Sequence, residues 1–564
     1  MTGRGTEAPR GSRERPFDLA VVGGGINGCA IARDAALRGL SVVLIEMRDF
    51  STGATWASSG MIHGGLRYLS SDPDVTRLAC LDSGFIQSIA PHLIFRIPFL
   101  MPWRDDGVSE RVMLELAEIY FTVYDRYQPL KRGLPHTRLT REEALRAEPG
   151  LRGDILGALT MDEWGIDAPR LTLLNALDAR AHGAELLTYH RVEGLIRSER
   201  TVLGVRARSR QSGALREIFA RATFNAGGPW SMGFARAEGA SSVDLRPGKG
   251  VHLITAGRVS NYAVVAKAID GRQIFICPQQ NTTLIGTTDD DYYGDMERIP
   301  VLHDEVEYLL QGVEASFPSI RSFPIIGTTV GCRATLSTYG RYEDDLSRAH
   351  RIYDHGAEGL DGFYSIAGGK LASYRIMAEE ATDAVARRLG ASRPCETRTR
   401  PLPGGTAPGV DIREFEEVGV SATAARRILY RHGANAADVL GLIRENPRWA
   451  GLVDPTEPLT EAELRYCIRH EHVERLDDLK RRCRLAIGPD AGLRSVAPAA
   501  RIFCQERGLA PSAFADVVQS FMQSRWEDRR GLAHTNARQA EVAAQTAWHL
   551  GAGLEHGVTA RSAP

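Results

Sequence analysis

The sequence predicts an α/β protein of several domains that ends in a purely helical domain. Three observations support this prediction: the length of the chain, a strand–turn–helix–strand pattern over residues 18–46, and helical periodicity after residue 406. A chain of 564 residues is too long for one compact core, so we expect two or three domains.

Charge and composition exclude several classes of protein. The 69 basic and 70 acidic residues nearly cancel, so we expect no nucleic-acid partner. No stretch approaches about 18 uninterrupted apolar residues, which argues against a membrane-spanning helix. The eight cysteines are scattered without a CxxC pair, so a reduced, cytoplasmic location fits them better than a disulfide framework. Residues 1–16 and 551–564 are expected to be disordered tails.

The first predicted element is a strand, DLAVV at 18–22, that runs into the turn GGGING. Gly23, Gly25 and Gly28 satisfy G-x-G-x-x-G, in which the glycines form a tight turn, admit a pyrophosphate and let helix and strand pack closely. A helix, NGCAIARDAALRG, follows and ends at Gly39, and the strand SVVLIE then ends on Glu46, an acceptor for the adenosine ribose. Together these elements predict dinucleotide binding rather than a glycine turn without a ligand, and the acid argues against NADP.

This unit alone leaves FAD and NAD open as the dinucleotide. Its place at the N-terminus and the small polar stretch STGATWASSG (51–60) favour FAD, because such a stretch can lie along the pyrophosphate and ribityl chain of a flavin.

Later segments resemble the FAD-dependent glycerol-3-phosphate dehydrogenases of the aerobic and anaerobic respiratory type. IHGGLRYL (62–69) resembles the family signature, and NAGGPW (225–230) resembles its second flavin motif. Further matches follow in the family's order: KGVH (249–252), IGTTDDDYYGD (285–295), GCRATL (331–336), GGKLASYR (368–375) and LPGG (402–405). The resemblance covers residues 17–405 firmly and the C-terminal region more loosely.

The resemblance implies a Rossmann-like FAD-binding domain of the glutathione-reductase/D-amino-acid-oxidase type, an α+β substrate domain and a helical C-terminal domain. The FAD-binding domain would be discontinuous, and the expected segments are 17–66, 192–230 and 359–405 for FAD, and 67–191 and 231–358 for the substrate domain. The runs IFICP and TLIGTT indicate a sheet in the substrate domain.

Residues 406–550 would form about six helices, one of them opened by a capping box of Thr460 and Glu463. The run RHEHVERLDDLKRRCRLAIG (469–488) resembles the cap of the aerobic enzymes and would otherwise be a solvated, charged helix pair. The anaerobic branch often ends in an iron–sulfur domain. Here Cys467, Cys483 and Cys504 cannot supply four thiolates, so we expect no metal.

The resemblance implies oxidation of sn-glycerol 3-phosphate to dihydroxyacetone phosphate, with the hydride passing to flavin N5 and the electrons to a membrane quinone. Peripheral attachment to the cytoplasmic membrane would follow, and PHLIFRIPFLMPW (91–103) could rest on lipid or form a buried strand or loop. Oxygen as the acceptor, another 2-hydroxy acid or an amine as the substrate, and a homodimer stay open. So does a flavin-binding protein with a decayed site, because Gly60 stands where many members carry lysine and Ala334 replaces a proline.

A phosphate ester needs several fixed cations, and the planar fork of arginine suits phosphate well. The substrate-binding residues implied by the resemblance are Arg67, Tyr68, Arg333, Arg348 and Lys370. An isolated arginine would otherwise be a solvated surface charge.

The catalytic residues would be His252, His63 and Arg333. The sequence does not decide which histidine removes the hydroxyl proton; we favour His252 as the base, with His63 near the isoalloxazine. Either histidine alone could instead be a buried structural residue.

The residues expected to bind FAD come from the glycine turn, the polar stretch after it and the later motifs. The apolar spacing over 371–389 predicts a helix whose N-terminus faces the flavin. The expected contacts are Gly23, Gly25, Ile26, Asn27, Gly28, Glu46, Thr52, Ser58, Ser59, His63, Gly64, Val192, Ala226, Gly227, Gly369, Lys370 and Leu371.

Overall fold

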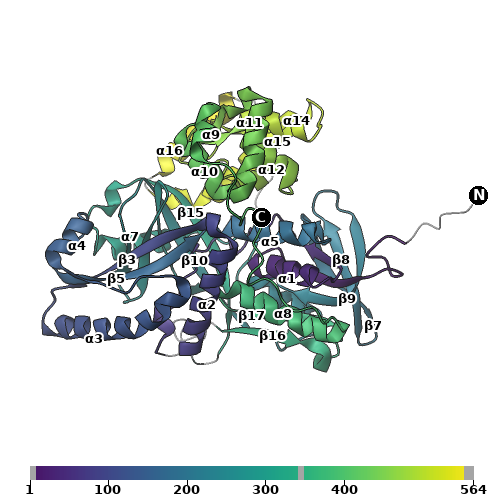
Figure 1. The fold of residues 1–564 in the computed structure, drawn as a ribbon, viewed down its shortest axis with the longest axis horizontal. Coiled ribbons are helices and arrows are strands. Elements are labelled where there is room, and N and C mark those ends of the chain that lie inside the picture. The colour runs from purple at the N-terminus through teal and green to yellow at the C-terminus, as the bar shows by residue number, and fades with distance from the viewer. Residues whose placement is uncertain (1–7, 71, 339, 341–348, 536, 552–564) are drawn as a thin grey trace, which may run out of the picture.

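The computed structural model describes residues 8–70, 72–338, 340, 349–535 and 537–551. Two large sheets lie side by side, and a group of helices lies across both of them, at the top of the view in Figure 1. Within the described ranges, none of the helices combines the length and the apolarity that a bilayer crossing requires.

The first sheet carries the predicted dinucleotide unit. Its strands follow the order β16-β17-β9-β1-β2-β6, and β8 pairs with both β7 and β9. All neighbours from β17 to β6 are parallel, whereas β16 is antiparallel. The bounds are β1 Phe17–Val22, β2 Val42–Ile45, β6 Glu185–Leu187, β7 His190–Ser198, β8 Thr201–Ser209, β9 Leu215–Asn225, β16 His350–Asp354 and β17 Phe363–Gly368.

Both faces of this sheet are covered, which explains the uninterrupted apolar runs of β1 and β2. Leu19 and Val21 of β1 face the helices α1 (Ile26–Leu37), α5 (Ala168–Ala181) and α8 (Tyr374–Leu389). Phe17 and Ala20 face the opposite side, where residues of β7, β8 and β9 pack. The strand–turn–helix–strand prediction and the Rossmann-like fold are therefore confirmed.

The second sheet contains the runs IFICP and TLIGTT as β12 and β13, so the predicted sheet is confirmed. Its order is β14-β10-β13-β12-β11-β3-β5-β4, with β15 on β10. The bounds are β3 Ile94–Arg104, β4 Arg138–Thr140, β5 Ile155–Ile166, β10 Leu245–Ala256, β11 Ala263–Lys267, β12 Gln273–Gln279, β13 Thr282–Gly286, β14 Asp290–Asp291 and β15 Ile325–Leu336. Helices α3 Val108–Tyr124, α4 Arg141–Ala147 and α7 His303–Glu314 pack beside this sheet. Helix α6 Ser231–Ala237 instead contacts β17, and α2 Pro73–Ile89 contributes Ala79 and Ile86 to the core under the first sheet.

The stretch 91–103 proves to be a strand rather than a lipid-contact loop. It forms a short 3₁₀ turn and then β3, which lies between β11 and β5. Ile97, Phe99 and Leu100 are buried there.

The C-terminal helices form a domain with its own apolar core, which includes Phe415, Leu464 and Phe521. The described part holds eight α-helices, two more than expected, because α9 and α13 are very short. They are α9 Ile412–Glu417, α10 Ala422–His432, α11 Ala436–Glu445, α12 Glu461–His470, α13 Leu479–Arg482, α14 Val496–Glu506, α15 Ala513–Arg529 and α16 Arg538–Gly551, with a small ladder of β18 Leu452–Asp454 and β19 Leu459–Thr460.

The predicted capping box is half formed. The Thr460 hydroxyl accepts from the Glu463 N–H at 3.2 Å, as expected for an N-cap. The Glu463 carboxylate instead accepts two hydrogen bonds from the Arg431 guanidinium, at 2.6 and 2.8 Å. The Glu463 carboxylate, which would complete a capping box, is used in a buried ion pair with Arg431.

The charged run 469–488 is not a solvated helix pair, so that alternative is wrong. Glu471, Asp478 and Arg482 are buried. They lie where the helical domain meets the first sheet, and their charges are satisfied by partners from both sides.

The prediction of a disordered N-terminal tail is also wrong for residues 8–16, the part of it that the structure describes. The Gly11 carbonyl accepts from the Phe219 N–H on β9 at 2.9 Å, and Gly11 lies against the Phe17 ring with φ of +83°. Residues near Gly11 therefore extend the packing of the sheet. Residues 1–7 and 552–564 lie outside the described ranges.

Candidate active site

The glycine turn forms a cradle at the N-terminus of α1. A Cβ at Gly28 would lie 1.8 Å from the Gly23 carbonyl oxygen, so only glycine allows this contact between helix and strand. Gly25 is open in comparison, because the nearest atom to a Cβ there is Thr55 Oγ1 at 3.5 Å. Since Ile26 and Asn27 open the helix, this space suits a phosphate held by backbone N–H groups.

Glu46 stands at the other end of the cradle. Its carboxylate accepts from the N–H groups of Gly24, at 2.6 Å, and Arg48, at 2.8 Å. Burial raises the pKa of this carboxyl despite those two hydrogen bonds. Each oxygen keeps a lone pair for a ribose hydroxyl. Val192 belongs to β7, two residues beyond His190, whose N–H donates to the Glu46 carbonyl at 2.9 Å.

The motif after β9 lies beside the glycine turn. Asn225 is in register with Val22 of β1 on one side and Ser365 of β17 on the other. The Ala226 N–H donates to the Val22 carbonyl at 2.8 Å, and the Gly227 N–H donates to Asn225 Oδ1 at 3.2 Å. Ala226 and Gly227 are thus brought to the carboxyl ends of the parallel strands, where such folds bind ligands.

The polar stretch 51–60 runs from this cradle to the second sheet. Ser51 donates its N–H to the Gly24 carbonyl at 3.0 Å, with Thr52 next in the chain. The Ser58 hydroxyl donates to the Thr55 carbonyl at 2.8 Å. Ser59 Oγ lies 3.0 Å from His252 Nε2. A single loop therefore joins the nucleotide fold to the expected catalytic histidine.

His252 and Arg333 share one face of the second sheet. On β10 and β15, Gly248 is in register with Arg333 and His252 with Thr329, so alternation places both side chains on the same side. His252 is buried, and burial together with the nearby Arg333 lowers its pKa to about 3. Its imidazole is therefore neutral near pH 7.

Arg333 is held by groups that the sequence motifs did not single out. Its guanidinium donates to Asp289 Oδ1 at 2.7 Å and to Thr287 Oγ1 at 3.2 Å. A Cβ at Gly250 would lie 2.7 Å from Arg333 Nη2, so the glycine leaves room for the arginine. Thr287 and Asp289 belong to the IGTTDDDYYGD match, which was the available signal.

Arg67, Tyr68 and Lys370 form a second cationic group. Arg67 Cζ and Lys370 Nζ each lie 4.9 Å from the centroid of the Tyr68 ring. Gly368 and Gly369 have φ of +77° and +81°, so this turn needs its glycines. Leu371 opens a 3₁₀ turn, and the helix predicted over 371–389 begins in regular form at Tyr374.

His63 is half-buried and precedes Gly64, which has no room for a side chain. A Cβ at Gly64 would lie 2.3 Å from Tyr124 Oη, and the Gly64 N–H donates to Glu163 at 3.2 Å. Glu163 is buried, and its other contacts are Lys131 Nζ at 2.5 Å and the Tyr124 hydroxyl at 2.7 Å. Sequence reasoning missed this support because its members come from unrelated segments without a motif.

Gly60 has a local reason in this chain. Its φ is +64°, and a Cβ there would lie 2.9 Å from the Ile166 carbonyl oxygen. A lysine at this position would need a different backbone path. Arg348 lies outside the described residues.

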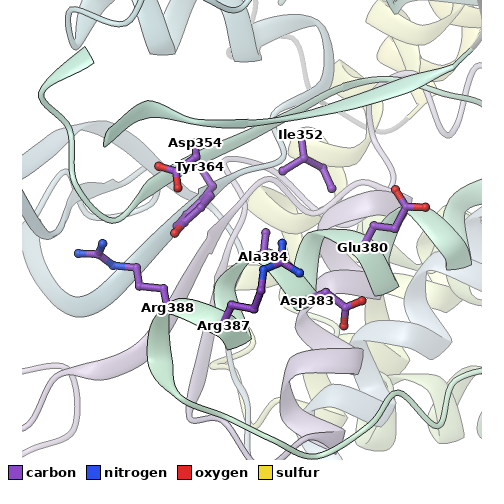
Figure 2. A pocket seen from close by; sticks show the side chains of 8 residues that line it. All are labelled: Ile352, Asp354, Tyr364, Glu380, Asp383, Ala384, Arg387 and Arg388. Atoms are coloured by element: carbon purple, nitrogen blue, oxygen red, sulfur yellow. The ribbon is translucent and has the colours of Figure 1, made fainter. Parts of the chain in front are cut away.

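A groove of about 730 Å³ between β16, β17 and α8 lies apart from these residues. Figure 2 shows it lined by strand residues such as Asp354 and Tyr364 and by Arg387 and Arg388 of α8. None of the expected site residues that the structure describes lines it. The site is instead the cradle, the loop after it and the two cationic groups.

Comparisons with known proteins identify the family of the chain. The family described as FAD dependent oxidoreductase matches residues 18–375, and the C-terminal domain of alpha-glycerophosphate oxidase matches residues 395–513. One chain of the anaerobic glycerol-3-phosphate dehydrogenase of Escherichia coli K12 is 32% identical over 539 residues, 93% of this chain and 95% of that protein. A glycerol-3-phosphate dehydrogenase of Mycobacterium leprae is 32% identical over 549 residues, covering 94% and 89%.

Among solved structures, the glycerol-3-phosphate dehydrogenase of Bacillus halodurans complexed with FAD is similar over 92% of this chain and 96% of that one, with 28% identity and a TM-score of 0.72. The glycine turn with its open Gly25, the helix N-terminus and the ribose acid fit the same cofactor. The chain therefore belongs to the FAD-dependent glycerol-3-phosphate dehydrogenase family, and FAD is its cofactor.

Proposed function

We propose that this protein oxidises sn-glycerol 3-phosphate to dihydroxyacetone phosphate and passes the electrons to a quinone. The observation that supports this most is a neutral, buried His252 beside the cation Arg333, at the end of the loop that leads from the FAD cradle. A phosphate-bearing alcohol needs this pairing of a base with a fixed positive charge.

The phosphate would be bound by Arg333 and by the group of Arg67 and Lys370. Asp289 and Thr287 orient the Arg333 guanidinium through hydrogen bonds of 2.7 and 3.2 Å. Arg67 and Lys370 both contact the Tyr68 ring, so the ring brings the two cations near each other. Three cations match a phosphate of about two negative charges better than they match a single carboxylate.

His252 would take the proton of the C2 hydroxyl. Bound FAD supplies the hydride acceptor, at N5 of its flavin. Ser59 contacts His252 Nε2 and Thr329 Oγ1 lies 3.4 Å from Nδ1, so both ring nitrogens are oriented. His63, next to Gly64 in the pinned loop, would orient the substrate.

Delivery to a quinone would need contact with lipid, and the outer face of α3 suits that contact. Val108, Val112, Met113, Leu116, Ile119 and Val123 form an exposed apolar stripe along this helix. The helix lies at the lower left edge of the molecule in Figure 1. On the inner side of the helix, the Tyr120 hydroxyl donates to the Leu66 carbonyl at 2.8 Å, next to Arg67 of the proposed phosphate site. The proposal therefore includes peripheral membrane attachment through α3.

Anaerobic titration of the flavin absorbance tests the reaction. Glycerol 3-phosphate should bleach it, whereas glycerol, lactate and amino acids at the same concentration should not. Bleaching by an amino acid but not by glycerol 3-phosphate would overturn the substrate assignment. Absence of bleaching by every compound would favour a decayed site.

The acceptor is tested separately in the presence of substrate. Quinone reduction without peroxide release supports the proposed acceptor. Peroxide release at the rate of substrate oxidation would instead make the protein an oxidase.

A further inference from the structure

Two arginines of the helical domain reach a short loop inside the FAD-binding fold. This loop, residues 46–51, begins at Glu46, which closes the ribose end of the cradle. It ends at Ser51, whose N–H donates to the Gly24 carbonyl of the glycine turn at 3.0 Å. Both ends of the loop therefore belong to the cofactor cradle.

Asp49, in the middle of the loop, is bound by Arg481 and Arg482 of α13. Arg482 forms a bidentate pair, with Nη1 to Oδ2 and Nη2 to Oδ1 both at 2.8 Å. Arg481 Nε adds a contact to Oδ2 at 2.6 Å. Both Asp49 and Arg482 are 1% exposed. Burial alone would raise the pKa of Asp49, but the two arginines outweigh it and hold that pKa below its ordinary value.

Arg482 is itself fixed inside the helical domain. Its Nε donates to the Glu471 carbonyl at 2.8 Å, and its Nη2 donates to the His472 carbonyl at 2.9 Å. The His472 ring in turn lies 5.6 Å from the ring of Phe50, the residue after Asp49. Because Arg482 forms hydrogen bonds in both the helical domain and the FAD-binding domain, it fixes the position of the 46–51 loop relative to the helical domain.

The same loop is also held from its other side. The Arg48 carbonyl accepts from the Tyr189 N–H at 3.0 Å, and the Tyr189 hydroxyl donates to Asp478 of the helical domain at 2.5 Å. A Cβ at Gly24 would lie 2.8 Å from the Phe50 ring, so the loop packs directly against the glycine turn. A shift of Asp49 would therefore move the ribose acid and the phosphate segment together.

We propose that the helical C-terminal domain retains FAD indirectly, with Arg482 as a positioning residue that holds the 46–51 loop through Asp49. The helical domain then raises the affinity for FAD although Arg482 itself does not contact the cofactor. This retention of FAD depends neither on the substrate nor on the electron acceptor.

The test replaces the fork of Arg482 with a single ammonium in Arg482→Lys. The matched control is Arg431→Lys, since Arg431 is equally buried and also bidentate, with Glu463 inside the same domain. Apoprotein of each full-length variant is titrated with FAD, followed by quenching of flavin fluorescence, and thermal midpoints are recorded. Lysine keeps the charge but loses the planar geometry in both variants.

The dissociation constant of FAD should rise about tenfold in Arg482→Lys, which corresponds to about 1.4 kcal/mol. It should stay at the parent value in Arg431→Lys, although both thermal midpoints fall. Once saturated with FAD, Arg482→Lys should keep the parent KM for substrate.

An unchanged FAD affinity in Arg482→Lys would overturn the proposal, as would an equal loss in Arg431→Lys, which would indicate general destabilisation. If Arg482→Lys does not fold, Asp49→Asn takes its place with the same two outcomes. Because the readout is FAD binding, a protein that fails to oxidise glycerol 3-phosphate leaves this inference intact.

Discussion

Arg333 is a cation that the protein orients before any ligand arrives. Asp289 and Thr287 fix its guanidinium, and Gly250 leaves the space that it fills. A preoriented charge needs little rearrangement when an anion binds, so its contribution to binding is large for one side chain.

Replacing Arg333 with alanine should therefore lower kcat/KM for glycerol 3-phosphate roughly thirtyfold or more and raise KM. This corresponds to a loss of about 2 kcal/mol or more of transition-state stabilisation. Steady-state kinetics of the FAD-loaded enzyme measure this. Arg321→Ala is the control, because Arg321 pairs with Glu307 and Glu314 on the surface of the same domain. A variant with the parent KM would show that the phosphate binds elsewhere.

His252 should make the folded protein sensitive to acid. Its pKa is about 3 when folded, against 6.5 for an ordinary histidine, so below pH 6.5 the unfolded chain takes up a proton that the folded one refuses. Titration of His252 therefore leaves the free energy of unfolding unchanged above pH 6.5 and lowers it as the pH falls from 6.5 toward 3.

In urea titrations between pH 6.5 and 4.5, His252→Gln should lose stability less steeply than the parent, by about 1.4 kcal/mol per pH unit. The comparison between the two proteins cancels the other titrating groups. Equal slopes would mean that folded His252 takes up its proton in the same pH range as the unfolded chain, so that burial does not lower its pKa.

At the scale of single residues, motifs predicted the positions that depend on backbone shape. Gly23 and Gly28 could be assigned from spacing, because the close helix–strand contact tolerates only glycine. Glu163 and Lys131 could not, because a buried ion pair between distant segments leaves no local pattern. Asp289 lies between these cases, inside a matched motif but without an assigned role.

At the scale of elements, α3 departs from ordinary amphipathic design. Leu114, Phe121 and Tyr124 are buried on its inner side, while Ile119 and Val108 on its outer side are 63% and 78% exposed. A helix with apolar residues on two faces needs a second apolar partner, which the proposed function takes to be lipid.

Ile119→Lys should weaken co-sedimentation with vesicles of phosphatidylethanolamine and phosphatidylglycerol by about tenfold, because a charge replaces buried hydrocarbon. Ile269→Lys is the control, since Ile269 is equally apolar and 76% exposed but lies outside α3. Equal binding by Ile119→Lys and the parent would exclude α3 as the lipid surface.

Element predictions succeeded where the local pattern is strong and failed where tertiary contacts override it. The first strand, helix and strand follow from apolar periodicity and a glycine stop. The capping box at Thr460 is incomplete because Arg431 binds Glu463, and the segment around Gly11 is ordered because β9 binds it. Neither partner is near in sequence.

At the scale of the whole molecule, the site exists only because three parts of the chain converge. The cradle belongs to the first sheet, His252 and Arg333 belong to the second, and Arg482 of the helical domain binds Asp49 in the 46–51 loop of the cradle. Residues 52–65 connect these parts, with Ser59 against His252 and Gly65 against Lys370.

The sequence by itself determined the dinucleotide unit, the family and the residue types available for an anionic alcohol, because these depend on short spacings and backbone requirements. Tertiary structure decided that His252 is neutral, that Asp289 orients Arg333 and that the charged run 469–488 is buried. Burial and the distance between charges control these properties, and neither can be read from spacing along the chain.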